Sequence, residues 1–504
     1  MKLKIMLINP PRVDGFPVVR EERFEHKDIG AVYPPLSLLY MAAALEKHQD
    51  YEIKVLDANG LDLTINQVEA EIVKFSPDMA VARCGFDTQK QDMRVMDLAK
   101  ALGAVTVMRN KIISEAAAVR DDMLKKNNVD VFINSEPDAV IEQLAAAVLN
   151  NREALKKKPQ PAACVRDPDC LVKEDWTFLK GVPGISFHYN GETVTTEPAK
   201  EPDNLDRLPL PAYHLLPDLK PYHTGVLPPP FALVATTRGC PFQCTFCAYG
   251  KSKCRERGIQ SVISELKYLK EKFSIKSFLF FDDTISIKEG RVEELAKRMI
   301  EEGLSGLEWS CCTRANLVNY EMLKIMKQAG MKEIAIGIET GSETILKNVK
   351  KGVSLDSMRQ AARWCKELGI MFYGLAIIGL PGETKETVKE TVKFIKEIDP
   401  FYTQFCFATP FPNTEIYGYY EKNNYILTKD WEKYFPLSEE PVVRTEALDA
   451  EGLKKMRRWA YMQVLMRPVY LLKKIRPFDW RWNIEGLAKV VSRIWRAITG
   501  KAVR

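Results

Sequence analysis

A regular alternation of short apolar runs with helix-like segments constrains this chain more than any other feature. Over the first 150 residues, five apolar runs of strand length alternate with five amphipathic stretches of helical period. Such alternation is typical of parallel strands joined by right-handed helical crossovers. We therefore expect an α/β protein that begins, at residues 1–150, with a doubly wound, Rossmann-like sheet of about five strands. The apolar runs are residues 4–10, 52–57, 78–83, 104–108 and 130–134.

The same alternation returns in the second half of the chain. Six further strand candidates lie between residues 231 and 408, with amphipathic helical segments between them. Six strand–helix units form most of a barrel, so residues 229–430 are predicted to be a partial (β/α)6 barrel of the TIM type. In α/β barrels the chemistry gathers in the loops that follow the strands.

Two further regions complete the expected organisation. Residues 151–228 are rich in proline and polar residues and are predicted to be a linker with a hairpin at 185–198. Residues 431–504 are predicted to be a basic, Trp-rich helical C-terminal region. No apolar run reaches the 18 to 20 residues of a spanning helix, and Pro10 and Pro11 interrupt the N-terminus before a signal-peptide core. We expect a cytoplasmic protein, with its 11 cysteines reduced.

Three of these cysteines stand together in the loop after the first barrel strand. They have the spacing Cys-x3-Cys-x2-Cys, in the segment "RGCPFQCTFCAYGK". A structural zinc site is normally closed by four ligands, and no clear fourth ligand lies nearby at a suitable spacing. An iron–sulfur cube held by three thiolates keeps one iron free for a substrate or cofactor. Zinc and buried structural thiols remain the alternatives. The cysteines are Cys240, Cys244 and Cys247.

This loop resembles the signature of the radical S-adenosylmethionine (SAM) superfamily. Phe246, the aromatic residue before the last cysteine, fits the same signature. The resemblance implies that the three thiolates hold a [4Fe-4S] cluster, whose fourth iron binds the amino and carboxylate groups of SAM. It also implies that the cluster receives its electron from a donor such as ferredoxin or flavodoxin.

Later strand ends resemble further segments of this superfamily, over roughly residues 231–420. "FFDDTIS" resembles the segment that contacts the SAM amino group, which nominates Asp282 and Asp283. "TRANL" carries Arg314, a candidate polar contact to SAM. The alternative interpretation of the two aspartates is that they cap the helix that follows.

Two more segments extend the resemblance. "GIETGSE" places Glu339 where the superfamily often binds the ribose of SAM, and "IIGLPGET" resembles the glycine-rich segment beside the adenine, which nominates Gly379 and Pro381. The alternatives are a surface glutamate beside a turn glycine and an ordinary loop.

The N-terminal sheet resembles the cobalamin-binding domain of one radical SAM subclass. Residues 31–47, 51–60 and 205–217 carry this resemblance. Two features depart from it: no histidine stands in an Asp-x-His-x-x-Gly loop, and the turn at residues 108–111 reads "MRNK" where glycines are expected. Without glycines the backbone cannot easily approach a bulky nucleotide tail. Cobalamin is therefore a candidate cofactor that the sequence leaves open.

The positive charge of the chain is concentrated near its end. Residues 451–504 hold 14 Lys and Arg against 3 acidic residues, together with four of the eight tryptophans. This composition predicts an interfacial helix pair in peripheral contact with an anionic membrane. The alternative is a helical cap packed on the barrel. Nucleic acid is not expected, because no recognised nucleic-acid motif accompanies the charge.

The resemblance implies an enzyme that cleaves SAM to a 5′-deoxyadenosyl radical, which abstracts hydrogen from an unactivated carbon. The main expectation is carbon–carbon bond formation, by ring closure or coupling, or oxidation of a lipid or isoprenoid-like substrate. The alternative is a cobalamin-dependent C-methyltransferase. A second alternative, from another class, is a cluster-containing SAM-binding or sensor protein without turnover.

Overall fold

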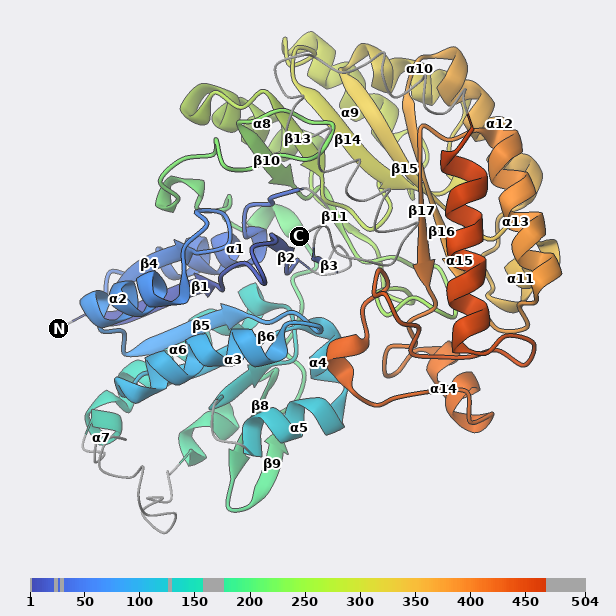
Figure 1. Cartoon of the computed structure of the whole chain (residues 1–504). Helices are drawn as coiled ribbons and strands as arrows, with labels where there is room; N and C mark the ends of the chain where they lie inside the picture. Colours follow the sequence, from blue (N-terminus) through green and yellow to red (C-terminus); the bar gives the residue numbers. More distant parts are fainter. Residues whose placement is uncertain (1, 22–25, 28–30, 126–128, 157–175, 468–504) are drawn as a thin grey trace. The chain divides into compact units, whose positions relative to one another are not determined.

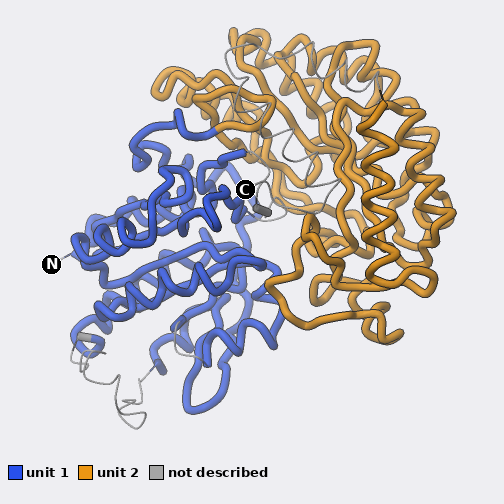
Figure 2. Tube along the Cα trace, viewed as in Figure 1, with its two compact units in different colours: residues 1–222 blue, residues 223–504 orange. Residues whose placement is uncertain are grey.

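The computed structural model of the chain divides into two compact units, Met1–Tyr222 and His223–Arg504 (Figure 2). It describes residues 2–21, 26–27, 31–125, 129–156 and 176–467. Each unit is an α/β structure built on its own sheet (Figure 1).

The first unit contains a seven-stranded sheet in which five parallel strands have the order second, first, third, fourth and fifth. This is a doubly wound order, as the alternation predicts. The parallel strands are β4 (Tyr51–Asp57), β1 (Leu3–Asn9), β5 (Met79–Arg83), β6 (Val105–Arg109) and β7 (Val131–Ile133), named in their order across the sheet.

The hairpin predicted within the linker belongs to this sheet. Strand β8 (Ile185–Tyr189) pairs antiparallel with β7, and β9 (Glu192–Thr195) pairs antiparallel with β8. Phe187, opposite Val131, is fully buried. The hairpin therefore covers the edge that β7 would otherwise expose, which removes a row of unpaired backbone groups.

Helices and a short ribbon complete the first unit. Helix α1 is buried at nine of its ten positions, because it packs against β4, β1 and α6. A reciprocal pair of hydrogen bonds between Thr64 and Gln67 begins α2. The helices are α1 (Leu36–Leu45), α2 (Ile65–Phe75), α3 (Gln89–Ala101), α4 (Lys111–Glu115), α5 (Ala117–Lys125), α6 (Pro137–Asn150) and α7 (Arg152–Lys156), and the ribbon is β2 (Val18–Val19) with β3 (His26–Lys27).

The second unit contains six parallel strands whose order across the sheet is their order in the chain. No pairing joins the last strand back to the first in the part of the chain that the structure describes, which confirms the predicted partial barrel. The strands are β10 (Phe231–Val234), β13 (Ser277–Phe280), β14 (Glu308–Thr313), β15 (Met331–Glu339), β16 (Met371–Ile378) and β17 (Tyr402–Phe407).

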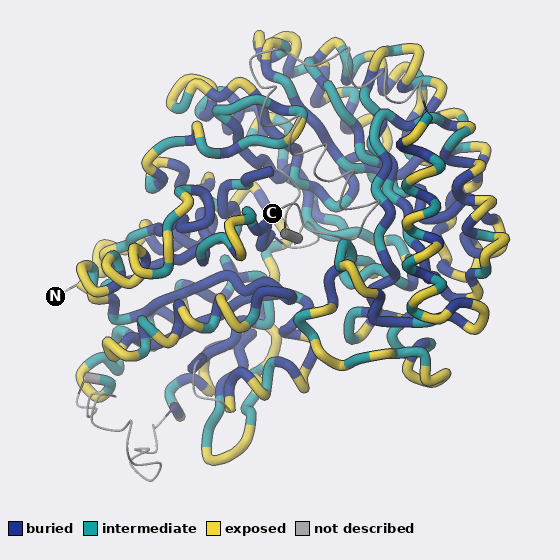
Figure 3. The backbone as a smooth tube through the Cα atoms, viewed as in Figure 1, coloured by how far each residue is buried: buried dark blue, intermediate teal, exposed yellow. Residues whose placement is uncertain are grey.

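Burial alternates along the later strands of this barrel (Figure 3). In β16, Phe372, Ala376 and Ile378 are buried on one face, while the residues between them are half-buried on the other. A strand with this pattern has helices on one face and the barrel interior on the other. The helices are α8 (Ile259–Phe273), α9 (Arg291–Glu301), α10 (Tyr320–Gln328), α11 (Glu343–Asn348), α12 (Leu355–Glu367), α13 (Lys385–Ile398), α14 (Glu415–Lys422) and α15 (Ala450–Leu465).

The described start of the basic C-terminal region is helix α15, which packs against α13, β16 and β17 (Figure 1). The backbone N–H of Phe405 donates a hydrogen bond of 3.0 Å to the Tyr461 hydroxyl. Residues 468–504, on which most of the membrane prediction rests, lie outside the described residues. Among the described helices, none combines the length and the apolar character needed to cross a bilayer.

A buried ion pair joins Arg257, just before α8, to Glu265 within α8. The Arg257 guanidinium contacts the Glu265 carboxylate and donates hydrogen bonds to Ala235 O at 2.9 Å and to Ser261 Oγ at 3.0 Å. Arg257 is 6% exposed and Glu265 is fully buried. Removing one member of a buried pair leaves the other charge without compensation.

We therefore expect Arg257→Met to lower the free energy of unfolding of the second unit by about 3–5 kcal/mol. The measurement is urea denaturation followed by tryptophan fluorescence, to which the buried Trp309 contributes. The double variant R257M/E265L removes both charges of the pair and should recover most of the lost free energy of unfolding. A single variant as stable as the wild type would contradict this account.

Candidate functional site

The three-cysteine loop begins just after β10 and is closed at its base by a two-stranded ribbon. Strand β11 (Thr237–Arg238) pairs antiparallel with β12 (Arg255–Glu256). Inside the ribbon, the Cys240 N–H donates to Ser252 Oγ at 3.1 Å and the Ser252 N–H donates to Cys240 O at 3.0 Å. The two ends of the loop are therefore held together by backbone pairing and by these hydrogen bonds.

Gly239 shows why this closure needs a glycine. Its φ is +92°, in the left-handed region, and a Cβ at this position would lie 2.4 Å from Lys253 O. A side chain here would collide with the returning strand of the ribbon. The residue before the first cysteine is thus fixed by backbone geometry.

The three thiols differ in exposure and in contacts. Cys244 is 7% exposed, whereas Cys240 and Cys247 are half-buried. The Cys247 N–H donates to Cys244 O at 3.2 Å, and the Tyr249 N–H donates to Cys247 Sγ at 3.4 Å. Among the described residues, no three His, Cys, Asp or Glu side chains gather closely enough to hold a single metal ion.

Cys254, a fourth cysteine close by, has a different environment. Burial and, to a smaller extent, the nearby Glu256 carboxylate raise the pKa of its thiol to about 11. A thiol with such a pKa stays protonated at neutral pH while no metal is bound to it.

Three buried polar atoms around the loop have no hydrogen-bond partner among the described residues. They are Thr237 Oγ1, Thr245 Oγ1 and Arg314 Nε. Buried polar atoms are almost always paired in native proteins. Two donor hydroxyls and a guanidinium N–H around three cysteines therefore fit a polar or anionic group bound beside the thiols.

Arg314, predicted as a contact to SAM, follows β14 and reaches the cysteine loop. Its Nη1 donates to Cys244 Sγ at 3.3 Å, and its Nη2 donates to Lys351 O. The guanidinium lies 3.8 Å from the centre of the Phe242 ring. This stacking and the two hydrogen bonds fix the plane of the guanidinium, so its Nε–H has a set direction.

Asp282, predicted as a contact to the SAM amino group, is fully buried. Its carboxylate accepts hydrogen bonds from Thr236 N at 2.7 Å, Thr237 N at 2.6 Å and Thr236 Oγ1 at 2.8 Å. Burial raises the pKa of Asp282, and these hydrogen bonds oppose the rise. Its described contacts thus anchor the backbone that leads into the cysteine loop. Asp283, beside it, is half-buried.

Glu339, the predicted ribose ligand, ends β15 with a φ of +60°. Its Oε1 accepts a hydrogen bond of 2.5 Å from Lys351 Nζ, and both side chains are under 9% exposed. Lys351 is not predicted from the sequence, because it lies 12 residues beyond Glu339 and belongs to none of the motifs above.

Gly379 and Pro381, the predicted adenine segment, form a turn after β16. Gly379 has a φ of +97°, its N–H donates to Glu383 Oε2, and its carbonyl accepts from the Tyr420 hydroxyl. Pro381 O accepts from Asn348 Nδ2 at 3.2 Å. Glu383 is 1% exposed, and burial raises the pKa of its carboxyl to about 8.

All the predicted site residues therefore follow strands of one barrel sheet at their carboxyl ends. The structure links part of the set directly: Cys244 contacts Arg314, Arg314 contacts the Lys351 backbone, and Lys351 contacts Glu339. The Lys351 ammonium also lies 5.9 Å from the centre of the Phe246 ring. No described hydrogen bond joins Asp282 or Gly379 to this chain of contacts.

The interior face of the later strands carries polar side chains. Ala335, Tyr373 and Tyr402 are paired across β15, β16 and β17, so their side chains project from the same face. The Tyr373 hydroxyl donates to Gln404 Oε1, and the Tyr373 and Tyr402 rings lie 5.1 Å apart. Burial raises the pKa of Tyr373, which keeps it a neutral phenol.

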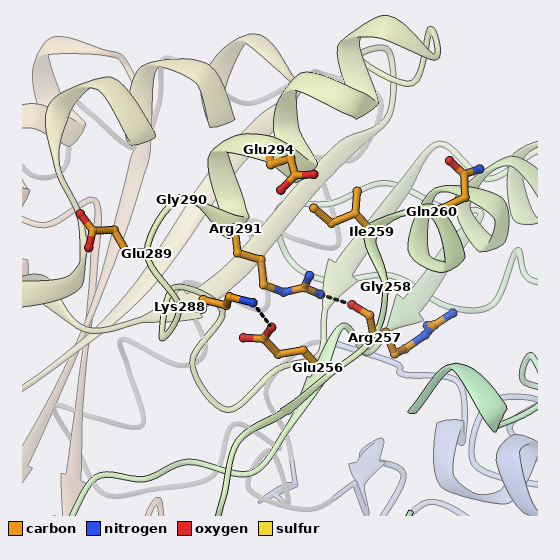
Figure 4. Close-up of a pocket in the computed structure, with 10 residues that line it drawn as sticks. All are labelled: Glu256, Arg257, Gly258, Ile259, Gln260, Lys288, Glu289, Gly290, Arg291 and Glu294. Carbon is orange, nitrogen blue, oxygen red and sulfur yellow. Dashed lines mark hydrogen bonds and ion pairs between the residues drawn. The ribbon is translucent and has the colours of Figure 1, made fainter. Parts of the chain in front are cut away.

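A hollow of about 700 Å³ lies elsewhere on this unit, at the N-terminal ends of α8 and α9 (Figure 4). Two of its cations have partners in the lining: Lys288 pairs with Glu256 at 3.3 Å, and Arg291 donates to the backbone carbonyl of Arg257 at 2.7 Å. None of the predicted site residues lines it. We assign it no function.

Comparison with known proteins decides the family. Residues 234–395 match the Radical SAM superfamily. An uncharacterized methyltransferase of Pyrococcus horikoshii is 30% identical over 97% of this chain and 98% of its own length. This chain belongs to the radical SAM superfamily. It is therefore a radical SAM enzyme, and enzymes of this superfamily use a [4Fe-4S] cluster and SAM.

Other similar proteins extend the likeness over most of the chain. The anaerobic magnesium-protoporphyrin IX monomethyl ester cyclase of Rubrivivax gelatinosus is 25% identical over 88% of this chain and 76% of its own length. The fold resembles two solved enzymes at 16% identity. They are the radical SAM methyltransferase TsrM of Kitasatospora setae (TM-score 0.62, 82% of this chain and 77% of that one) and the cobalamin-dependent radical SAM enzyme OxsB (TM-score 0.67, 99% and 72%).

The raised pKa of Glu383 predicts how stability depends on pH. The folded protein holds this proton up to about pH 8, whereas the unfolded chain releases it near the ordinary pKa of 4.5. The stability from the neutral carboxyl is therefore complete below 4.5 and is lost as the pH rises through 8. Glu383→Gln cannot ionise and should lack this fall.

The measurement is the free energy of unfolding of both proteins between about pH 5 and about pH 9. We expect the wild type to lose stability relative to E383Q as the pH rises. A difference between the two that stays constant over this range would contradict the assignment.

Proposed function

We propose that this chain is a radical SAM C-methyltransferase. The observation that carries the proposal is the 30% identity to a methyltransferase that extends over nearly the whole of both chains, and not over the barrel alone. Cytidylyl-2-hydroxyethylphosphonate methyltransferase of Streptomyces wedmorensis, 26% identical over 82% of this chain, supports the same reaction class. These relatives favour the alternative of the sequence analysis over its main expectation of ring closure or oxidation.

We assign the [4Fe-4S] cluster to Cys240, Cys244 and Cys247. The fit rests on the closed loop that presents the three thiols and on the buried, unpaired Thr237 Oγ1, Thr245 Oγ1 and Arg314 Nε around it. These donors suit sulfide and carboxylate acceptors. When bound, the cluster supplies the electron that cleaves SAM.

The other strand-end residues orient SAM and exclude water from it. In this proposal Glu339 accepts hydrogen bonds from the ribose hydroxyls, and the turn at Gly379 and Pro381 lies beside the adenine. Arg314 holds the Cys244 thiolate and keeps its Nε–H for a SAM oxygen. Asp282 acts through the backbone at residues 236–237, and Asp283 contacts the SAM amino group.

The carboxyl end of the first sheet fits part of a cobalamin molecule. Asn134 Oδ1, just after β7, is buried without a hydrogen-bond partner among the described residues, and it can accept from the amides that border a corrin ring. The turn after β6 is less suited to a nucleotide tail, since Asn110 there is fully buried, caps Ile113 N at 3.0 Å and donates to Cys84 O at 2.7 Å. When bound, cobalamin would supply a carrier for the methyl group.

Ring closure is the second candidate reaction. It is favoured by the cyclase relative from Rubrivivax gelatinosus, which covers 88% of this chain. The lipid or isoprenoid-like substrate stays a prediction. The electron donor of the ferredoxin or flavodoxin class and the peripheral membrane contact likewise stay predictions.

The products of SAM separate these reactions. Iron-reconstituted, full-length protein is incubated without oxygen with SAM and a strong reductant, with and without methylcobalamin, and adenosine-containing products are measured. A methyltransferase of this kind should form both 5′-deoxyadenosine and S-adenosylhomocysteine, the second only when cobalamin is present. Formation of 5′-deoxyadenosine alone under both conditions would favour ring closure or oxidation. Absence of both products would favour a SAM-binding protein without turnover.

Cluster content tests the assignment of the ligands. Replacing Cys240, Cys244 or Cys247 with alanine should abolish bound [4Fe-4S], because each removes one of three thiolates. Iron and sulfide per chain, with the visible absorption spectrum, are the measurements. Cys254→Ala is the matched control and should keep the full cluster. Retention of the cluster by any of the three variants would refute the assignment.

A further inference from the structure

Lys351 stands beside the predicted ribose ligand, yet it has no role in the sequence motifs. It follows α11 and its ammonium makes the 2.5 Å hydrogen bond to Glu339 Oε1. Among the described residues, neither the Lys351 ammonium nor the Glu339 carboxylate makes any other hydrogen bond. Glu339 Oε2 therefore remains available to a ligand.

The surrounding backbone is shaped for this ion pair. The pairing of β15 with β16 shifts register between Gly337 and Glu339, and Glu339 then takes a φ of +60°, which is uncommon for a residue with a side chain. A Cβ at residue 337 would lie 2.2 Å from Glu339 Oε1 and 2.7 Å from Lys351 Nζ. Strained backbone of this kind persists only where the surroundings enforce it, and it gathers at functional sites.

Two further contacts fix Lys351 itself. The Lys351 N–H donates to Leu346 O at 3.1 Å, which closes the turn after α11, and Lys351 O accepts from Arg314 Nη2. The Lys351 side chain is 7% exposed. Since Arg314 also contacts Cys244, the lysine is held by the same side chain that touches the thiol loop.

Charge explains why such a lysine is needed. Glu339 is 6% exposed, and a buried carboxylate without a counter-ion is strongly disfavoured. Paired with Lys351 through one oxygen, the carboxylate has a counter-ion and keeps a fixed direction while the other oxygen accepts hydrogen bonds from a diol. Ion pairing and ligand binding therefore use different oxygens of one carboxylate.

We propose that Lys351 is the positioning residue for the ribose of SAM: it pairs with Oε1 of the Glu339 carboxylate and orients the group so that Oε2 binds the ribose hydroxyls. This inference rests on the proposed assignment of Glu339, and it adds a residue outside the motifs to the SAM site. It concerns binding, so it does not depend on which reaction follows SAM cleavage.

The test is the dissociation constant for SAM of the reconstituted, full-length enzyme, measured by equilibrium dialysis without reductant. We expect Lys351→Met to weaken SAM binding by at least about tenfold. Lys351→Arg keeps the charge and should restore much of the affinity. Lys350→Met is the matched control, because Lys350 is exposed and pairs with Glu415 at 2.6 Å on the surface, and it should leave the affinity unchanged.

A double-mutant cycle separates positioning from a merely structural role. E339Q alone should weaken SAM binding, and adding K351M to E339Q should cost little more, since the carboxylate that the lysine holds is gone. Additive losses, an unchanged dissociation constant in K351M, or tighter binding in K351M would each overturn the proposal. Iron and sulfide content identifies any variant that fails to fold. If K351M fails to fold, the SAM affinity of E339Q/K351M, which buries no unpaired charge, is compared with that of E339Q.

Failure of this inference is distinguishable from failure of the proposed function. If the wild type binds SAM and the cycle is non-additive, yet S-adenosylhomocysteine never forms, the methyltransferase assignment fails and the role of Lys351 stands. If S-adenosylhomocysteine forms but the losses in K351M and E339Q are additive, the methyltransferase assignment stands and the role of Lys351 fails. A wild type that does not bind SAM would overturn both.

Discussion

The parallel pairing of six barrel strands is the constraint on which the candidate site depends. Parallel strands place all their carboxyl ends at one edge, so side chains that are far apart in the chain meet there, as Cys244 and Arg314 do across 70 residues. The loop after β10 supplies the thiols, and the ends of β14 and β15 supply Arg314 and Glu339. The sheet itself contributes almost no chemistry. It fixes the positions from which short loops reach one another.

The charged side chains at that edge of the sheet are buried. Asp282, Arg314, Glu339 and Lys351 are all at most 6% exposed. Each is compensated locally, by backbone N–H groups, a thiol, a carbonyl or an opposite charge. Groups held in this way cannot reorient without losing a partner, which favours a site formed before its ligands arrive.

The sequence predicts a large part of this arrangement. The period of the apolar residues predicts both sheets and the open barrel, because parallel strands with helical crossovers leave a clear pattern. Cys240, Cys244, Cys247 and Glu339 are recognisable because their motifs are short and local. Lys351 is not, since its position over Glu339 depends on the turn after α11 and on the bulge in β15. In the same way, no local signal shows that the carboxylate of Asp282 faces the backbone after β10, or that β8 pairs with β7.

The antiparallel extension of the first sheet bears on how the chain can be divided. A cut near residue 150, where the alternation of strands and helices pauses, would separate β7 from β8 and strip the hairpin from its sheet. The fragment would then present the backbone of a three-residue edge strand to other molecules and would be prone to self-association. Expression of either half by itself should therefore divide the chain between Tyr222 and His223, where the two compact units meet in the sequence.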